Sequence, residues 1–141
     1  MIIIETLKPS NSDDLCEAYA IWSKGYFGTS LEDFRKATEN VNITVLLAKN
    51  EKSIVGLSVL VFYEGRQMWS RGEPLCDVEC VRITDESNYN EIANKFYDTA
   101  KQLSNNKRCI KLSVTDFQDR RFFTAIGLDY DRCVCEYHLT H

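Results

Sequence analysis

The sequence lacks the features that mark exported, membrane-spanning and repetitive chains. Its apolar start, Met1-Ile2-Ile3-Ile4-Glu5, carries no basic segment and no small-residue cleavage site, so we expect no secretory signal. No apolar run approaches the roughly 20 residues of a membrane-spanning helix. Internal repeats, low-complexity tracts and linkers are also absent. A chain of 141 residues is then expected to form a single domain, residues 1–141, that is soluble and cytoplasmic.

Positive charge is scarce as well. Lysine and arginine together number 17, against 21 aspartates and glutamates, and the formal net charge is −4. Such a surface repels nucleic acids and anionic membranes, so we expect neither as a partner. It favours cationic partners instead. The hydrophobic fraction of 44% and the charged fraction of 27% are typical of a globular domain.

Cysteine pairs with the spacing C-x-x-C are absent, although the chain has six cysteines. The closest spacings are Cys76-x-x-x-Cys80 and Cys133-x-Cys135, both in strand-like runs. A zinc ion bound by cysteines of neighbouring strands, with His138 nearby, is one interpretation. Free cysteine usually behaves as a small buried hydrophobe, so we expect reduced structural thiols and no metal.

What is present is an alternation of strand-like and helical patterns along the whole chain. The predicted strands cover residues 2–7, 42–50, 54–63, about 75–84, 109–114 and 131–139. Two predicted helices begin at capping segments, Ser12-Asp13-Asp14 and Ser30-Leu31-Glu32-Asp33, and two more cover 85–106 and 117–126. The order β-α-α-β-β-β-α-β-α-β indicates a mixed α/β, or α+β, fold.

Two short segments resemble motifs of one enzyme family. The stretch from Arg120 to Tyr130, RRFFTAIGLDY, resembles the F-Y-x-x-x-G-F signature of GNAT-type N-acetyltransferases, with Phe123 in the place of the tyrosine. Ile54-Val55-Gly56 is similar to the x-V-G that begins the third strand of these domains. The order of elements is that of the family, and the resemblance covers nearly the whole chain. It implies the GNAT fold, a splayed and mostly antiparallel sheet flanked by about four helices, with acetyl-CoA as co-substrate.

The resemblance also implies where acetyl-CoA binds. The family motif Q/R-x-x-G-x-G/A binds the pyrophosphate through backbone N–H groups at a helix N-terminus. Its equivalent here is Asn88-Tyr89-Asn90-Glu91-Ile92-Ala93, in which Glu91 replaces the central glycine. The alternative interpretation is a capping box, Asn88-x-x-Glu91, that uses the same N–H groups.

Further contacts with the co-substrate follow from the same resemblance. The pantetheine would follow the backbone of Val81, Arg82 and Ile83, and Phe123 would line the cleft. Arg120 and Arg121 would face the phosphates, or else form a solvated face paired with Asp116 and Asp119.

Catalysis is expected on the strand over residues 75–84. Alternation places Asp77, Glu79, Val81 and Ile83 on one face. Because family members commonly carry a glutamate on this strand, Glu79 is our candidate general base, with Asp77 second, and burial would raise such a pKa towards neutrality. The alternative is a structural acid pair bound to Arg66, Arg71 or Arg82. Phe123 cannot protonate the leaving thiolate, and Tyr97, Tyr130 and Tyr137 are possible substitutes.

The acceptor is expected near the end of the first helix. Trp22, Tyr26 and Phe27 fall where the family binds substrate and could contact an amine through their rings, although such aromatics are also common in a core. The segment 69–75 is similar to the polyamine-acetyltransferase branch, which agrees with the acidic charge. Dimers are common in the family, so a homodimer is one expected assembly.

The predicted function is acetyl-CoA-dependent N-acetylation of a primary amine, on a small molecule or peptide, by direct transfer. One alternative is a catalytically inactive GNAT-fold domain that binds acyl-CoA, another ligand or a protein partner. The other is an unrelated α+β binding module.

Overall fold

Six strands form one sheet, in the order in which they occur along the chain. The computed structural model describes residues 1–25, 28–64, 74–115, 120–127 and 135–138. The strands are β1 (Ile2–Thr6), β2 (Ile43–Asn50), β3 (Ser53–Tyr63), β4 (Leu75–Ile83), β5 (Lys111–Val114) and β6 (Cys135–His138). Neighbouring strands pair antiparallel except β4 and β5, which are parallel. The predicted mixed, mostly antiparallel sheet is therefore confirmed.

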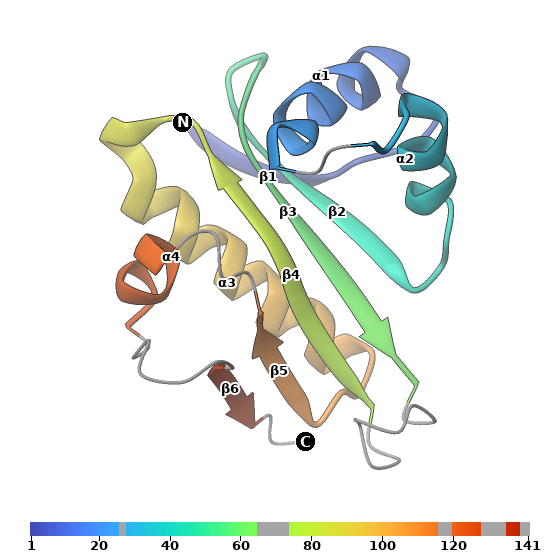
Figure 1. Cartoon of the computed structure of the whole chain (residues 1–141). Helices are drawn as coiled ribbons and strands as arrows, with labels where there is room; N and C mark the ends of the chain where they lie inside the picture. Colours follow the sequence, from blue (N-terminus) through green and yellow to red (C-terminus); the bar gives the residue numbers. More distant parts are fainter. Residues whose placement is uncertain (26–27, 65–73, 116–119, 128–134, 139–141) are drawn as a thin grey trace.

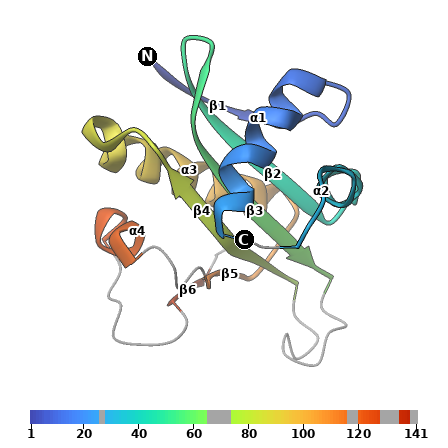
Figure 2. The same cartoon turned by 45° about the horizontal axis from the view of Figure 1, so that its top comes forward.

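Helices cover both faces of this sheet (Figures 1 and 2). On one face lie α1 (Ser12–Trp22), the 3₁₀ turn η1 (Ser23–Gly25) and α2 (Leu31–Thr38). The other face carries the 3₁₀ turn η3 (Glu86–Asn88), the long α3 (Tyr89–Asn106) and the short α4 (Arg120–Ala125). None of the helices in the described ranges is long and apolar enough to cross a membrane.

The sheet separates two hydrophobic cores. The larger lies under α3 and α4 and includes Leu60, Val78, Phe96 and Phe122, each at most 1% exposed. The smaller lies under α1 and α2 and includes Phe34, Leu57 and Cys80. Cys76 and Cys109 are buried as well, and Cys16 is exposed. Within the described part of the chain, no three His, Cys, Asp or Glu side chains are grouped so as to hold a metal ion.

Gly56 explains why the x-V-G segment requires a glycine. A Cβ atom there would lie 3.2 Å from the Arg82 carbonyl oxygen and 3.3 Å and 3.4 Å from the side chains of Phe96 and Ile92. The first two distances are tighter than most Cβ contacts, so a side chain at position 56 would require small shifts of the Arg82 backbone and of the Phe96 ring on α3. Gly56 thus sets how closely α3 packs.

Helix capping partly differs from expectation. Ser30 caps α2 as predicted, since its hydroxyl accepts a hydrogen bond from the Asp33 N–H at 3.1 Å. The cap of α1 is Asn11, one residue before the predicted Ser12, and its side chain accepts from the Asp14 N–H. Either residue type can cap a helix, so the sequence could not decide between them.

The backbone of β4 is irregular at Glu79. Val59 faces Cys80 across the ladder while Leu60 faces Val78, so Glu79 is an extra, bulged residue. The predicted alternation is therefore wrong beyond this point. Asp77 and Glu79 share a face, whereas Val81 and Ile83 turn to the α3 side and pack in the larger core.

Candidate active site

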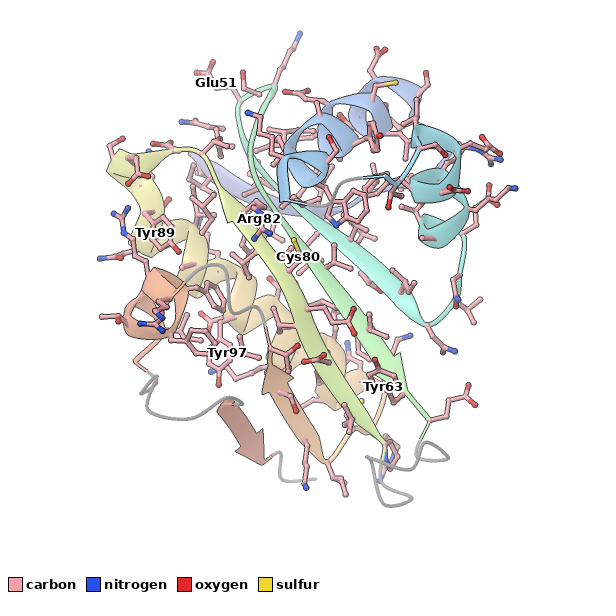
Figure 3. All side chains as sticks on the ribbon, in the orientation of Figure 1. Glu51, Tyr63, Cys80, Arg82, Tyr89 and Tyr97 are labelled. Atoms are coloured by element: carbon pink, nitrogen blue, oxygen red, sulfur yellow. The ribbon has the colours of Figure 1, made fainter. Side chains whose placement is uncertain are left out.

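Four polar side chains meet where the parallel ladder of β4 and β5 ends. That ladder pairs Leu75–Val78 with Lys111–Val114, and the Thr115 N–H then donates to the Val78 carbonyl at 3.0 Å. Beyond it β4 continues to Ile83, whereas β5 ends at Val114 (Figure 1). The Thr115 hydroxyl lies 2.9 Å and 2.8 Å from the two carboxyl oxygens of Asp77. The Tyr63 hydroxyl donates to Oε1 of Glu79 at 3.0 Å, from the end of β3 (Figure 3).

The environment of Asp77 makes it titrate near neutral pH. Burial raises the pKa of Asp77 to about 7, and the hydrogen bond from Thr115 opposes this rise. The negative charge of Glu79 and a hydrogen bond between the two carboxyl groups add to the rise. Two neighbouring carboxyl groups of which one is buried tend to share one proton. Asp77 is therefore protonated in about half of the molecules at pH 7, and a protonated Asp77 can donate a hydrogen bond to Glu79.

Tyr63 is the hydroxyl partner of this pair. Burial raises its pKa to about 12, and the hydrogen bond with Glu79 adds to the rise. Tyr63 therefore stays protonated at neutral pH and remains a hydrogen-bond donor to Glu79.

A pocket opens beside Glu79, between the sheet and the first two helices. Its volume is about 210 Å³. It is lined by Trp22, Thr29, Asp33, Phe34, Ala37, Thr38, Ile43, Val45, Val59, Val61, Glu79 and Cys80. The Trp22 ring, predicted to contact substrate, forms part of the wall and packs against Phe34 with 5.1 Å between centroids. Tyr26 and Phe27, predicted for the same role, lie outside the described residues.

The residues predicted to bind the pantetheine lie on the part of β4 beyond the ladder. Val81 is buried in the larger core, and Ile83 is half-buried against it. Arg82 is half-buried, and its guanidinium Nη1 donates to the Val81 carbonyl at 2.7 Å (Figure 3). The predicted contact of their backbone with the pantetheine stays a prediction.

The start of α3 differs from the predicted capping box. Asn88 is the N-cap residue, but its side chain makes no capping hydrogen bond and instead donates to Asp85 Oδ2 at 2.8 Å. Asp85 in turn accepts from the Asn88 N–H at the start of η3. The capping-box interpretation is therefore wrong for Asn88. Glu91 and Asn90 are exposed, while Tyr89 and Ala93 are buried.

The arginines of α4 are placed differently from one another. Arg121 forms an ion pair with Glu86, and its guanidinium carbon lies 4.0 Å from the centre of the Tyr89 ring. The partners expected from the sequence, Asp116 and Asp119, lie outside the described residues. Arg120 is exposed at the start of α4, and Phe123 is buried at 1% exposure.

The sequence does not single out Tyr63, Thr115 or Glu86. Tyr63 belongs to the alternating series Val59, Val61, Tyr63, which only indicates a shared face. Its pairing with Glu79 depends on the register of β3 against β4, and that of Thr115 with Asp77 depends on the parallel ladder. The register between strands that are far apart in the sequence produces no local sequence pattern from which it could be predicted.

Comparison with solved structures identifies the fold. No protein-family model matches the sequence, and no curated protein sequence is significantly similar to it. An aminoglycoside acetyltransferase from an uncultured soil metagenomic sample, in complex with trehalose, superposes with a TM-score of 0.73 at 19% identity, over 99% of this chain and 96% of that chain. A ribosomal-protein-alanine N-acetyltransferase from Brucella melitensis biovar Abortus 2308 gives 0.72 at 13% identity, over the full length of both chains.

A third structure is the aminoglycoside N-acetyltransferase AAC(6')-Iy in complex with the bisubstrate analogue CoA-S-monomethyl-acetylneamine. It gives a TM-score of 0.71 at 12% identity, over 100% of this chain and 99% of that chain. Together these likenesses show that the chain has the GNAT fold, as its sequence predicts.

Proposed function

We propose that this chain is an acetyl-CoA-dependent N-acetyltransferase that acetylates a primary amine of a small molecule or peptide by direct transfer. The observation that carries the proposal is the carboxyl pair of Asp77 and Glu79. Glu79 lines a pocket and Asp77 lies in the ladder of β4 with β5, in a chain with the fold of the acetyltransferases. The solved structures AAC(6')-Iy with CoA, and with a CoA bisubstrate analogue, support acetyl-CoA as the donor.

Glu79 is the candidate general base. A primary amine is an ammonium ion at neutral pH and must lose a proton before its nitrogen can attack a carbonyl carbon. Glu79 lines the pocket, so its carboxylate can accept this proton. Asp77 and Tyr63 are positioning residues, because the hydrogen bonds that they make to Glu79 hold its carboxyl group in place.

The residues present fit acetyl-CoA in two respects. β4 continues to Ile83 beyond the end of its ladder with β5, and backbone amides along a strand suit a strand-like pantetheine arm. The Asn88 side chain does not occupy the first N–H groups of α3, and such groups bind phosphates. When bound, acetyl-CoA would supply an acetyl group on a thioester sulfur, which leaves as the CoA thiol when the amide forms.

An inactive GNAT-fold domain that binds a ligand or protein partner is the second candidate. Phe123 favours it, because a buried phenyl ring offers no proton to a thiolate. Glu86 and Glu91 favour it too, because their negative charges near the start of α3 oppose a pyrophosphate.

Binding and turnover separate the two candidates. Acetyl-CoA at 100 times its dissociation constant should stabilise the fold by about 2.7 kcal/mol, and a series of amines should be acetylated with release of CoA thiol. Glu79→Gln should lower kcat by about 10²- to 10⁴-fold and leave acetyl-CoA affinity unchanged. Acetyl-CoA binding without turnover of any amine would support the inactive domain. Absence of any stabilisation at millimolar acetyl-CoA would exclude the transferase.

A further inference from the structure

The pocket beside Glu79 has an uneven distribution of polar groups. Of the lining residues in the described part of the chain, all are apolar apart from Thr29, Thr38 and the two acids Asp33 and Glu79. Phe34, Val45 and Cys80 form its buried part, each at most 4% exposed. A ligand in this pocket therefore places most of its surface against hydrocarbon and aromatic rings.

The charges of the lining are of one sign. Among the described residues, two acidic side chains and no lysine, arginine or histidine line the pocket. Asp33 is exposed on α2, whereas Glu79 is half-buried on β4, so the two carboxyl groups lie on different walls. A single cationic group on the ligand would match this pattern, and Trp22 adds an aromatic ring that can also contact a cation.

The volume limits the size of the ligand. Pockets for drug-sized molecules measure roughly 300–1,000 Å³, and a cavity of about 150 Å³ holds benzene. The 210 Å³ of this pocket thus fits one ring, or an aliphatic body of similar size, with a short aminoalkyl arm.

From these features we infer that the acceptor is a compact primary amine with an apolar body, of the arylalkylamine type, and not a polyamine or an aminoglycoside. Additional ammonium or hydroxyl groups would be buried here without enough polar partners, which opposes binding. The similarity of segment 69–75 to polyamine acetyltransferases and the aminoglycosides of the structural neighbours would have suggested polar acceptors. The inference rests on the proposed function only in treating the bound amine as the acceptor.

The test measures amine binding without acetyl-CoA, by calorimetry on the full chain. The probes are 2-phenylethylamine, ethanolamine, which lacks the ring, 2-phenylethanol, which lacks the charge, and the polar amines spermidine and sisomicin. We expect 2-phenylethylamine to bind at least tenfold more tightly than each of the others, since even one methylene in an apolar pocket changes selectivity by about tenfold or more.

A variant in the wall tests the location. Ala37 lines the pocket from an exposed position of α2, so Ala37→Leu adds bulk to the pocket without disturbing a core. We expect it to weaken 2-phenylethylamine binding at least tenfold. Lys36→Leu, at the neighbouring exposed position outside the lining, is the matched control and should leave binding unchanged.

The results distinguish this inference from the proposed function. Tight binding of 2-phenylethylamine that Ala37→Leu abolishes supports the inference even if no amine is acetylated, in which case the transferase proposal fails alone. Acetylation of spermidine or sisomicin, with weaker binding of 2-phenylethylamine, overturns the inference and leaves the transferase proposal intact. An equal effect of Ala37→Leu and Lys36→Leu also overturns it.

Discussion

Replacing Asp77 by asparagine should stabilise the fold at alkaline pH and have little effect at acidic pH. The Asp77 carboxyl group is 8% exposed, and burial raises its pKa from 3.8 to about 7. In the unfolded chain it ionises near 3.8, so between pH 4 and pH 7 the folded state binds the extra proton. Stability from this group is therefore complete below about pH 4, falls as pH rises to 7, and stays low above it.

The magnitude follows from the difference between the two pKa values. Each pKa unit corresponds to about 1.36 kcal/mol, so the roughly three units at Asp77 lower the free energy of unfolding by up to about 4 kcal/mol at pH 8. Asparagine carries no charge at any pH and is nearly the same size. Its amide oxygen can accept from Thr115, and its NH₂ group can donate to Glu79 in place of the shared proton.

Urea denaturation at pH 4.5 and at pH 8 measures this effect. We expect Asp77→Asn to raise the free energy of unfolding by about 2–4 kcal/mol at pH 8, and by much less at pH 4.5. Asp98→Asn, at an exposed position of α3, is the matched control and should show no such pH dependence. A change of the same size at both pH values would refute the placement of a buried, protonated carboxyl group at Asp77.

Three further changes test other parts of the structure. Tyr63→Phe removes the hydroxyl that donates to Glu79, and should lower stability by about 1 kcal/mol in urea denaturation and reduce kcat/KM in the amine assay; unchanged turnover would show that Tyr63 does not position Glu79. Glu86→Gln removes a negative charge near the start of α3 and releases Arg121 from its ion pair, so calorimetry at low salt should show about two- to fivefold tighter binding of acetyl-CoA. The control Glu17→Gln, on α1, should leave the affinity for acetyl-CoA unchanged. Gly56→Ala should destabilise the fold by about 1–3 kcal/mol, because its Cβ would meet the Arg82 carbonyl and α3; a neutral effect would show that α3 can move away freely.

The order of elements and the fold could be predicted because they depend on local patterns. Apolar spacing identified α1 and α3, and the strand-like runs identified all six strands to within a few residues. The resemblance at Ile54-Val55-Gly56 and at Phe122 to Gly127 then singled out one fold among the α+β arrangements. Gly127 has a φ of 80°, which favours glycine just beyond the end of α4.

The sequence predicts which types of residue cap each helix, but not which individual residue does so. Each helix start contains several adjacent residues that can accept a hydrogen bond from an N–H group, such as Asn11 next to Ser12 and Asp85 close to Asn88. Which of them does so depends on how the preceding chain enters the helix, and that is decided by packing against the sheet. The consequence for function is direct, because capping by Asp85 leaves the Asn88 side chain off the amides of α3.

The candidate site could be predicted only in part, because it depends on one irregularity of the backbone. Asp77 and Glu79 were identified from their type and spacing, and both lie in the site. The bulge at Glu79 left no trace in the sequence, since residues on both faces of β4 are buried and the alternation of polar and apolar residues is weak.

That bulge explains why two consecutive residues of β4 line the pocket. It turns Glu79 and Cys80 to the same side, so that both line the pocket under α1 and α2, and it sends Val81 into the core under α3. It lies directly after Val78, the last residue of β4 that pairs with β5, and bulges increase the local bend and twist of a strand. The end of the β4–β5 ladder, the carboxyl pair and the β4 part of the pocket lining therefore occur together at residues 77–80. A regular strand over the same residues would place Cys80 in the larger core and remove it from the pocket, so the lining of the proposed acceptor site depends on the bulge.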